Sequence, residues 1–130
     1  NRRSIYIHVK RSLRFQMLAD FDQADTDTPC AVRFATTVPT QALAMLNSKL
    51  VNDQAVVFAD MLRADGEDDL RSRIHRGLAL VTQRKPEEAE VEHCVELVER
   101  LQSERGLTEK QAMERFALVA LNLNEFMYLD

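Results

Sequence analysis

The chain has 130 residues, of which 45% are hydrophobic and 29% are charged, as in an ordinary globular domain. Three glycines and three prolines are few for an all-β fold, and the net charge of −4 argues against a nucleic-acid partner. No apolar run approaches the roughly 20 residues that span a bilayer, so we expect no membrane insertion. Because the chain opens at Asn1 without methionine, we expect a fragment of a longer chain.

An apolar stripe at helical spacing predicts a first helix over residues 3–18. The stripe consists of Ile5, Tyr6, Val9, Leu13 and Met17. Residues 2–14 also carry five cationic side chains and no acid. Capture of a ligand or anion by this basic segment is therefore one hypothesis for its role. Without an aromatic stacking platform, the segment does not favour nucleic-acid binding.

A long acidic loop is predicted between the first and second helices. It contains Asp20, Asp22, Asp25 and Asp27, and no basic residue follows until Arg33. Such a loop should fold back on the basic segment before it. A calcium site is the alternative, because hard cations bind carboxylate oxygens, but the spacing lacks the central glycine and closing glutamate of an EF-hand. We therefore favour a solvated or arginine-paired loop and predict no metal site.

The junction after this loop is the most distinctive part of the sequence. Thr36 and Thr37 precede Pro39, which suits the first position of a helix that we expect to run to about Arg63. Its predicted apolar face consists of Leu43, Leu46, Leu50, Val57, Phe58 and Met61. Asn47 and Gln54 lie within that face. We expect them to be buried and to brace the core, with a pocket wall as the alternative.

Three further helices are predicted over residues 67–83, 86–104 and 108–124. Gly66 and Gly106 are helix stops, and Thr108 with Gln111 forms a capping box. The inward residues are predicted to be Leu70, Ile74, Leu78, Val81, Val91, Cys94, Val95, Val98, Leu101, Met113, Phe116, Ala117 and Ala120. The tail should pack on the core through Phe126, Met127 and Tyr128. The predicted fold is a single all-α domain over residues 1–130, an irregular bundle of about five helices.

The two cysteines, Cys30 and Cys94, could form a disulfide, although two free buried thiols are favoured. The chain contains no Cys-x-x-Cys-His haem attachment, no Gly-rich phosphate loop, no His-Glu-x-x-His and no Gly-x-Ser-x-Gly. We therefore predict no catalytic residue and no cofactor in this chain, and whether the protein is an enzyme stays open.

Five segments resemble one family in their order along the chain. They are Arg2–Arg11, the acidic loop leading from Phe21 to Arg33, Thr36–Asn47, Arg84–Glu90 and Leu121–Asp130. The family is the domain of unknown function 1553, a C-terminal module of large exported proteins of planctomycetes. The resemblance implies a multidomain parent in the periplasm or at the cell surface, often with a cytochrome c-like domain and hence haem elsewhere in the parent. The resemblance also implies that this chain is the C-terminal portion of the module. It supplies no activity for the protein.

The resemblance also indicates which residues to watch. They are the polar members of its longest motif, namely Arg33, Thr36, Thr37, Gln41 and Asn47. Our first hypothesis is an interaction or scaffolding module that docks against upstream domains of its own chain. The alternative is part of the pocket wall of an enzyme acting on polysaccharide or in an associated redox step. The sequence identifies no particular protein or carbohydrate partner.

Overall fold

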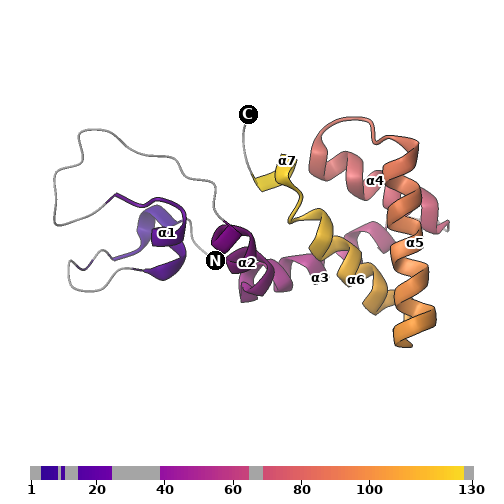
Figure 1. Ribbon diagram of the computed structural model, residues 1–130, viewed down its shortest axis with the longest axis horizontal. Coiled ribbons are helices and arrows are strands. Elements are labelled where there is room, and N and C mark those ends of the chain that lie inside the picture. Colours follow the sequence, from indigo (N-terminus) through magenta and orange to yellow (C-terminus); the bar gives the residue numbers. More distant parts are fainter. Residues whose placement is uncertain (1–3, 9, 11–14, 25–38, 65–68, 128–130) are drawn as a thin grey trace. The chain divides into compact units, whose positions relative to one another are not determined.

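The computed structural model of the protein describes residues 4–8, 10, 15–24, 39–64 and 69–127 (Figure 1). These residues are mostly helical, with seven α-helices and one 3₁₀ turn, so the all-α prediction is confirmed. By contacts, the chain divides into two compact units, residues 1–44 and 45–130, which we describe separately. The single domain and the bundle of about five helices stay predictions. None of the described helices combines the length and the apolar character needed to cross a bilayer.

The first unit contains a 3₁₀ turn, Ser4–Tyr6, the short helix α1, Gln16–Asp20, and the start of α2, Pro39–Asn47. The predicted continuous helix over residues 3–18 is wrong, because Ile7, His8 and Phe15 are not helical. Phe15 is instead the extended residue that precedes α1. Isoleucine, tyrosine and histidine are weak helix formers, and Ile5 and Tyr6 are exposed, so burial does not compensate for the low propensity.

The predicted long second helix is two helices, because the chain breaks at Ser48 between α2 and α3, Lys49–Ala64. Asparagine and serine compete with the helix for backbone hydrogen bonds. At the break, the Asn52 amide donates to the carbonyls of Leu46, at 2.9 Å, and Ser48, at 3.0 Å. The bond to Leu46 satisfies a carbonyl that the end of α2 leaves without a helical partner, whereas the Ser48 carbonyl also accepts the Asn52 backbone N–H at 3.0 Å.

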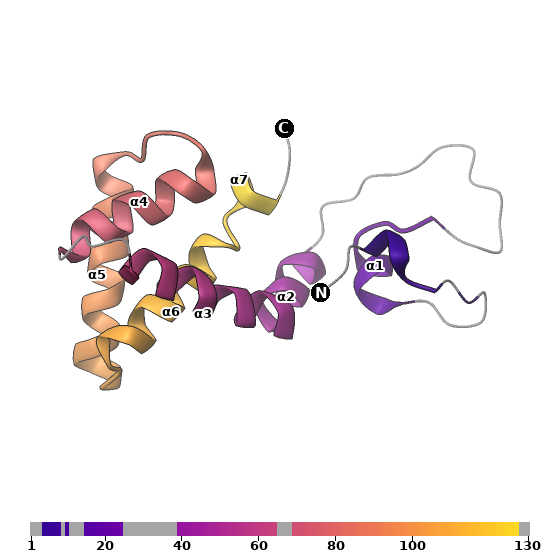
Figure 2. The same cartoon turned by 180° about the vertical axis from the view of Figure 1, so that it is seen from behind.

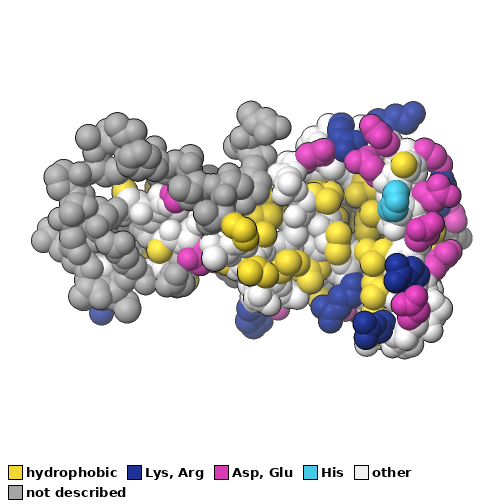
Figure 3. All heavy atoms as spheres, viewed as in Figure 1, with side chains coloured by type: hydrophobic (Ala, Val, Ile, Leu, Met, Phe, Trp, Pro, Cys, Tyr) yellow, Lys and Arg dark blue, Asp and Glu magenta, His cyan; other side chains and the backbone are white. Residues whose placement is uncertain are grey.

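The core of the second unit is formed by α3 with α4, Leu70–Thr82, α5, Glu88–Arg105, and α6, Glu109–Ala120. Helix α7, Asn124–Met127, follows. α3 packs mainly on α6, and it lies in front of α6 in Figure 2. The inward residues predicted for the last three long helices are confirmed as buried or as packed against the core. Figure 3 shows charged side chains of both signs over α5 and hydrophobic side chains over α6.

The buried face of α3 differs from the one that the sequence predicted by a rotation of roughly 110° about the helix axis. Its buried residues are Val51, Ala55, Ala59 and Leu62, whereas Leu43, Leu46, Leu50, Val57 and Met61 are exposed, and only Phe58 packs against the core. Asn47 and Gln54 are exposed too, so the prediction that they brace the core is wrong. The reason is size: small alanines on α3 meet buried Ala112, Ala117 and Ala120 of α6, which permits close packing of the two helices.

Helix ends in the second unit follow their sequence signals. The Asp69 carboxylate caps α4, and the predicted capping box of Thr108 and Gln111 starts α6. Gly106 adopts φ 63° after α5, as expected for a left-handed helix stop. Gly77, inside α4, has a different role: a Cβ there would lie 2.9 Å from the Phe116 ring. Its missing side chain lets α4 approach α6 closely.

The C-terminal segment packs on the core through residues other than those predicted. Leu121 and Leu123 contact the core, whereas Phe126 is 48% exposed and its predicted burial is wrong. Met127 is half-buried. Tyr128 lies outside the described residues, as do Asp25, Asp27 and most of the predicted acidic loop.

Candidate functional site

Gln41 is the member of the predicted polar cluster that the structure places most clearly. It lies in the first turns of α2 and is 2% exposed, the one buried polar side chain among the described residues. Its amide donates to the backbone carbonyl of Asp20 at 2.9 Å. Asp20 is the last residue of α1, where carbonyls lack helical partners. Gln41 therefore joins α2 to the end of α1 within the first unit, which is a bracing contact.

The other members of the cluster are not brought together with Gln41 by the described structure. Asn47 is exposed at the end of α2, six residues beyond Gln41. Arg33, Thr36 and Thr37 lie outside the described residues. A convergent polar pocket at the Thr36–Asn47 motif therefore stays a prediction.

The acidic loop is described only at its start. Asp20 ends α1, and Asp22 adopts a left-handed φ of 58° in the turn that follows. Asparagine and aspartate tolerate this conformation better than most residues. Within the described ranges, no three histidine, cysteine, aspartate or glutamate side chains are arranged to hold a metal ion. The calcium alternative is left untested, because Asp25 and Asp27 lie outside those ranges.

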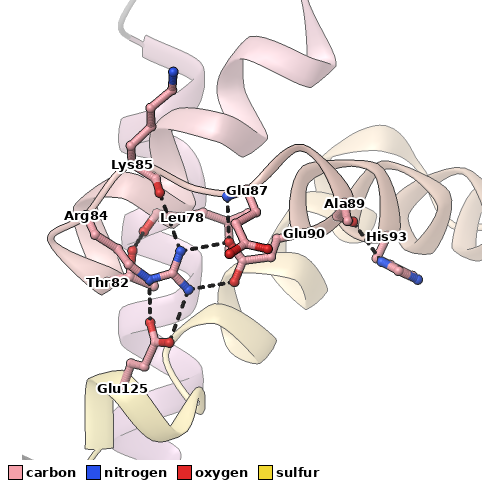
Figure 4. A network of polar contacts seen from close by, with 9 residues as sticks. All are labelled: Leu78, Thr82, Arg84, Lys85, Glu87, Ala89, Glu90, His93 and Glu125. Carbon is pink, nitrogen blue, oxygen red and sulfur yellow. Dashed lines mark hydrogen bonds and ion pairs between the residues drawn. The ribbon is translucent and has the colours of Figure 1, made fainter.

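A charged network that the sequence did not predict centres on Arg84, in the turn between α4 and α5 (Figure 4). Its guanidinium donates to both carboxylate oxygens of Glu90, at 2.6 and 2.9 Å. It also donates to both oxygens of Glu125 in α7, at 3.1 and 3.2 Å. Glu90 accepts a further bond from the Glu87 backbone N–H at 2.7 Å. One arginine thus ties the start of α5 to the C-terminal helix.

The hydrogen bonds in this network shift the acid–base equilibria of its members. The Arg84 guanidinium, with the Glu87 N–H as a second donor, lowers the pKa of Glu90 to about 2. The pKa of Arg84 is raised by its hydrogen bonds to Glu90 and Glu125. Arg84 and Glu90 are each 38% exposed in their side chains, so solvent screens the pair and its contribution to stability is modest.

The network joins two of the segments that carry the family resemblance, Arg84–Glu90 and Leu121–Asp130. A polar bond of the same segment caps α6, where the Asn122 amide donates to the Leu118 carbonyl at 2.7 Å. The sequence shows Glu90 as an acid near the start of a helix. It does not show that Glu90 and Glu125 bind the same arginine. The two glutamates are 35 residues apart (125 − 90), and only the fold brings them together.

Two further places, a small cleft and a cysteine, contain side chains that often act in binding or catalytic sites. A cleft of about 250 Å³ is lined by Arg71, Ser72, His75, Arg76, Glu88 and Val91. It is smaller than ordinary ligand pockets, and Glu88 already pairs with Arg71 in it. Cys94 is a free, half-buried thiol, as the sequence favoured. Burial raises its pKa, so the reactive thiolate is scarcer than in an exposed cysteine.

These features define an all-α protein whose described residues include a bracing contact at Gln41 and a charged network at Arg84. Residues 1–98 match the family model PSD1, described as a protein of unknown function (DUF1553). The match covers more than half of the chain, so the chain belongs to this family. No curated protein and no solved structure matches the chain.

Proposed function

We propose that the protein is a helical interaction or scaffolding module of an exported multidomain protein, and that upstream domains of the same chain dock on its first unit. The observation that supports this is the exposure of apolar residues in a segment that carries the family resemblance. Ile5 is 81% exposed and Tyr6 is 72% exposed. Phe15 adds a third large apolar side chain, at 53%. Neighbouring exposed apolar side chains of this size are typical of a contact surface.

The bracing role of Gln41 supports the same proposal. A buried amide that bonds to backbone holds α1 and α2 together, as expected of a bracing residue. The alternative, a pocket wall of a polysaccharide-active or redox enzyme, has no supporting observation among the described residues. The periplasmic or cell-surface location, and haem elsewhere in the parent, are further parts of the proposal that rest on the family resemblance.

Hydrogen exchange on this chain, with and without the upstream segment of its parent, tests the proposal. We expect added protection in the first unit when the upstream segment is supplied, and weaker binding when Ile5 and Tyr6 are both replaced by serine. Leu80→Ser is the matched control, because Leu80 is an exposed apolar residue of the second unit. Unchanged exchange, or equal weakening by the control, would refute docking on the first unit.

A further inference from the structure

Helix α3 is apolar on two faces that lie about 130° apart around its axis. The inner stripe, Val51, Ala55, Ala59 and Leu62, is buried in the core of the second unit. The outer stripe consists of Leu50, Val57 and Met61, which are 47%, 61% and 42% exposed. At about 100° per residue, the three outer residues point within about 40° of one another and away from Ala55. A helix that is apolar on both sides is typical of one that is covered on both sides.

The outer stripe has the residue spacing of a helix-to-helix contact. Leu50 and Val57 are seven residues apart, and Met61 follows after four, which is the spacing of a coiled-coil seam. Leu46 continues the apolar sequence before the break at Ser48, and it is 40% exposed. The Asn52 amide bonds to the Leu46 carbonyl at 2.9 Å and so holds this residue to the first turn of α3.

We propose that this stripe binds the same stripe of a second copy, with the two α3 helices antiparallel. The spacing is symmetric about the midpoint between Asp53 and Gln54. Leu50 and Val57 lie equally far on either side of that midpoint, and Leu46 and Met61 do too. A two-fold interface is self-complementary, so Leu50 meets Val57 of the second copy.

The charges beside the stripe match this arrangement. Lys49, Asp53 and Asp60 lie on one flank, and Lys49 is 88% exposed while it pairs with Asp53 at 2.6 Å. In the antiparallel dimer, Lys49 comes within about 3 Å, along the helix axis, of Asp60 of the second copy. Asp60 is 48% exposed beside Arg63 and Lys110. The two Asp53 carboxylates face each other near the axis, and each keeps its own Lys49 as counter-charge.

Sedimentation equilibrium on the 130-residue chain tests the proposal. We expect a concentration-dependent dimer, and Val57→Lys should raise its dissociation constant at least about tenfold, because a charge would enter the middle of the seam. Val119→Lys is the matched control, since Val119 is 42% exposed on α6, outside the stripe. Both variants should keep the helical circular dichroism spectrum of the unsubstituted 130-residue chain. A strictly monomeric chain, or a dimer that Val57→Lys leaves unweakened, would overturn the proposal.

Cross-linking tests the direction of the two helices in a background that carries Cys30→Ser and Cys94→Ser. Gln54→Cys should oxidise to a covalent dimer, because the two copies of residue 54 lie close to the symmetry axis. Met61→Cys should not, because its two copies are about 22 Å apart along the helices. Equal cross-linking at both positions would indicate parallel helices and contradict the proposal.

Substitutions of the charged residues beside the stripe should change the dissociation constant of the dimer in opposite directions. Lys49→Glu should weaken the dimer several-fold, since it replaces an attraction to Asp60 by a repulsion. Asp53→Asn should strengthen it, because it removes the repulsion between two carboxylates. The reverse signs would refute the antiparallel register. The sedimentation, cross-linking and charge tests do not depend on docking on the first unit, which uses Ile5 and Tyr6.

Discussion

Apolar residues at helical spacing are buried in α4, α5 and α6 of the second unit, whereas such residues near the start of the first unit are exposed. Ile74 and Phe116 of the second unit have no exposed surface, whereas Ile5 and Tyr6 of the first are mostly exposed. The sequences of both regions contain the same helical spacing, so spacing alone does not decide the outcome. In the second unit, caps and neighbouring helices agree with the spacing, and three helices bury one face each. The first unit shows that helical spacing without such support does not produce a long helix.

The largest expected effect is the removal of a buried ring. Phe116→Ala should lower the free energy of unfolding by about 3–5 kcal/mol, because it leaves a cavity among α3, α4 and α6. Urea denaturation followed by circular dichroism measures this loss. Phe15→Ala, in the first unit, is the matched change and should cost less than about 1 kcal/mol, because Phe15 is 53% exposed. Equal losses would contradict the difference between the two units.

A smaller effect is expected from filling the space beside Gly77. Gly77→Ala gains helix propensity, of about 1 kcal/mol, but places its Cβ 2.9 Å from Phe116 and 3.0 Å from Leu62. Overpacking of a close-packed core costs about 1–3 kcal/mol, so we expect a net loss of about 1 kcal/mol. Thermal unfolding measures it. The double variant Gly77→Ala, Phe116→Leu should recover part of the loss, and failure to do so would indicate strain elsewhere.

The capping box of α6 gives a comparable but more local effect. Thr108→Ala should cost about 1 kcal/mol, because the Gln111 N–H loses its side-chain acceptor at 3.3 Å. Amide hydrogen exchange should rise mainly in the first turn of α6. Thr108→Ser keeps a hydroxyl and is the control. If serine and alanine behave alike, the hydroxyl does not stabilise the helix.

The smallest expected effect concerns pH. The folded pKa of Glu90 is about 2, below its ordinary value of 4.5, so its contribution to stability is present above pH 4.5. That contribution is lost as the pH falls from about 4.5 to 2. Arg84→Met should return the pKa of Glu90 toward its ordinary value, as measured by NMR titration, and remove this part of the pH dependence. An unchanged titration of Glu90 would contradict the network.

The sequence predicted the second unit better than the first for physical reasons. In α4, α5 and α6 each helix has one apolar face, so the buried faces follow, and Gly106 and Thr108 mark two of the ends as predicted. The start of α4 was predicted three residues early, and the end of α6 four residues late. α3 has two apolar faces, and choosing the one with larger residues was wrong. The alanines of the inner face pack closely against α6, which is a property of the pair of helices and not of α3 alone.

The candidate site was predictable only in part. Gln41 belongs to a motif that the sequence singled out, and its bond to Asp20 agrees with a bracing role. The Arg84 network was missed, because Glu125 lies 41 residues from Arg84 and no local pattern pairs them. Long-range ion pairs depend on how α7 packs against α4 and the turn that follows it, which helical spacing does not determine.

The half-buried Cys94 gives the second unit a built-in chemical probe. Its thiol packs against the core from α5, and its raised pKa keeps the reactive thiolate scarce at neutral pH. Opening of α5 would expose this thiol fully, so alkylation of Cys94, followed residue by residue with mass spectrometry, should become faster when α5 opens. A change in the labelling rate then reports a change in how often this helix separates from its neighbours, without a mutation or a dye. A reagent added in living cells would give the same quantity for the protein in its own compartment.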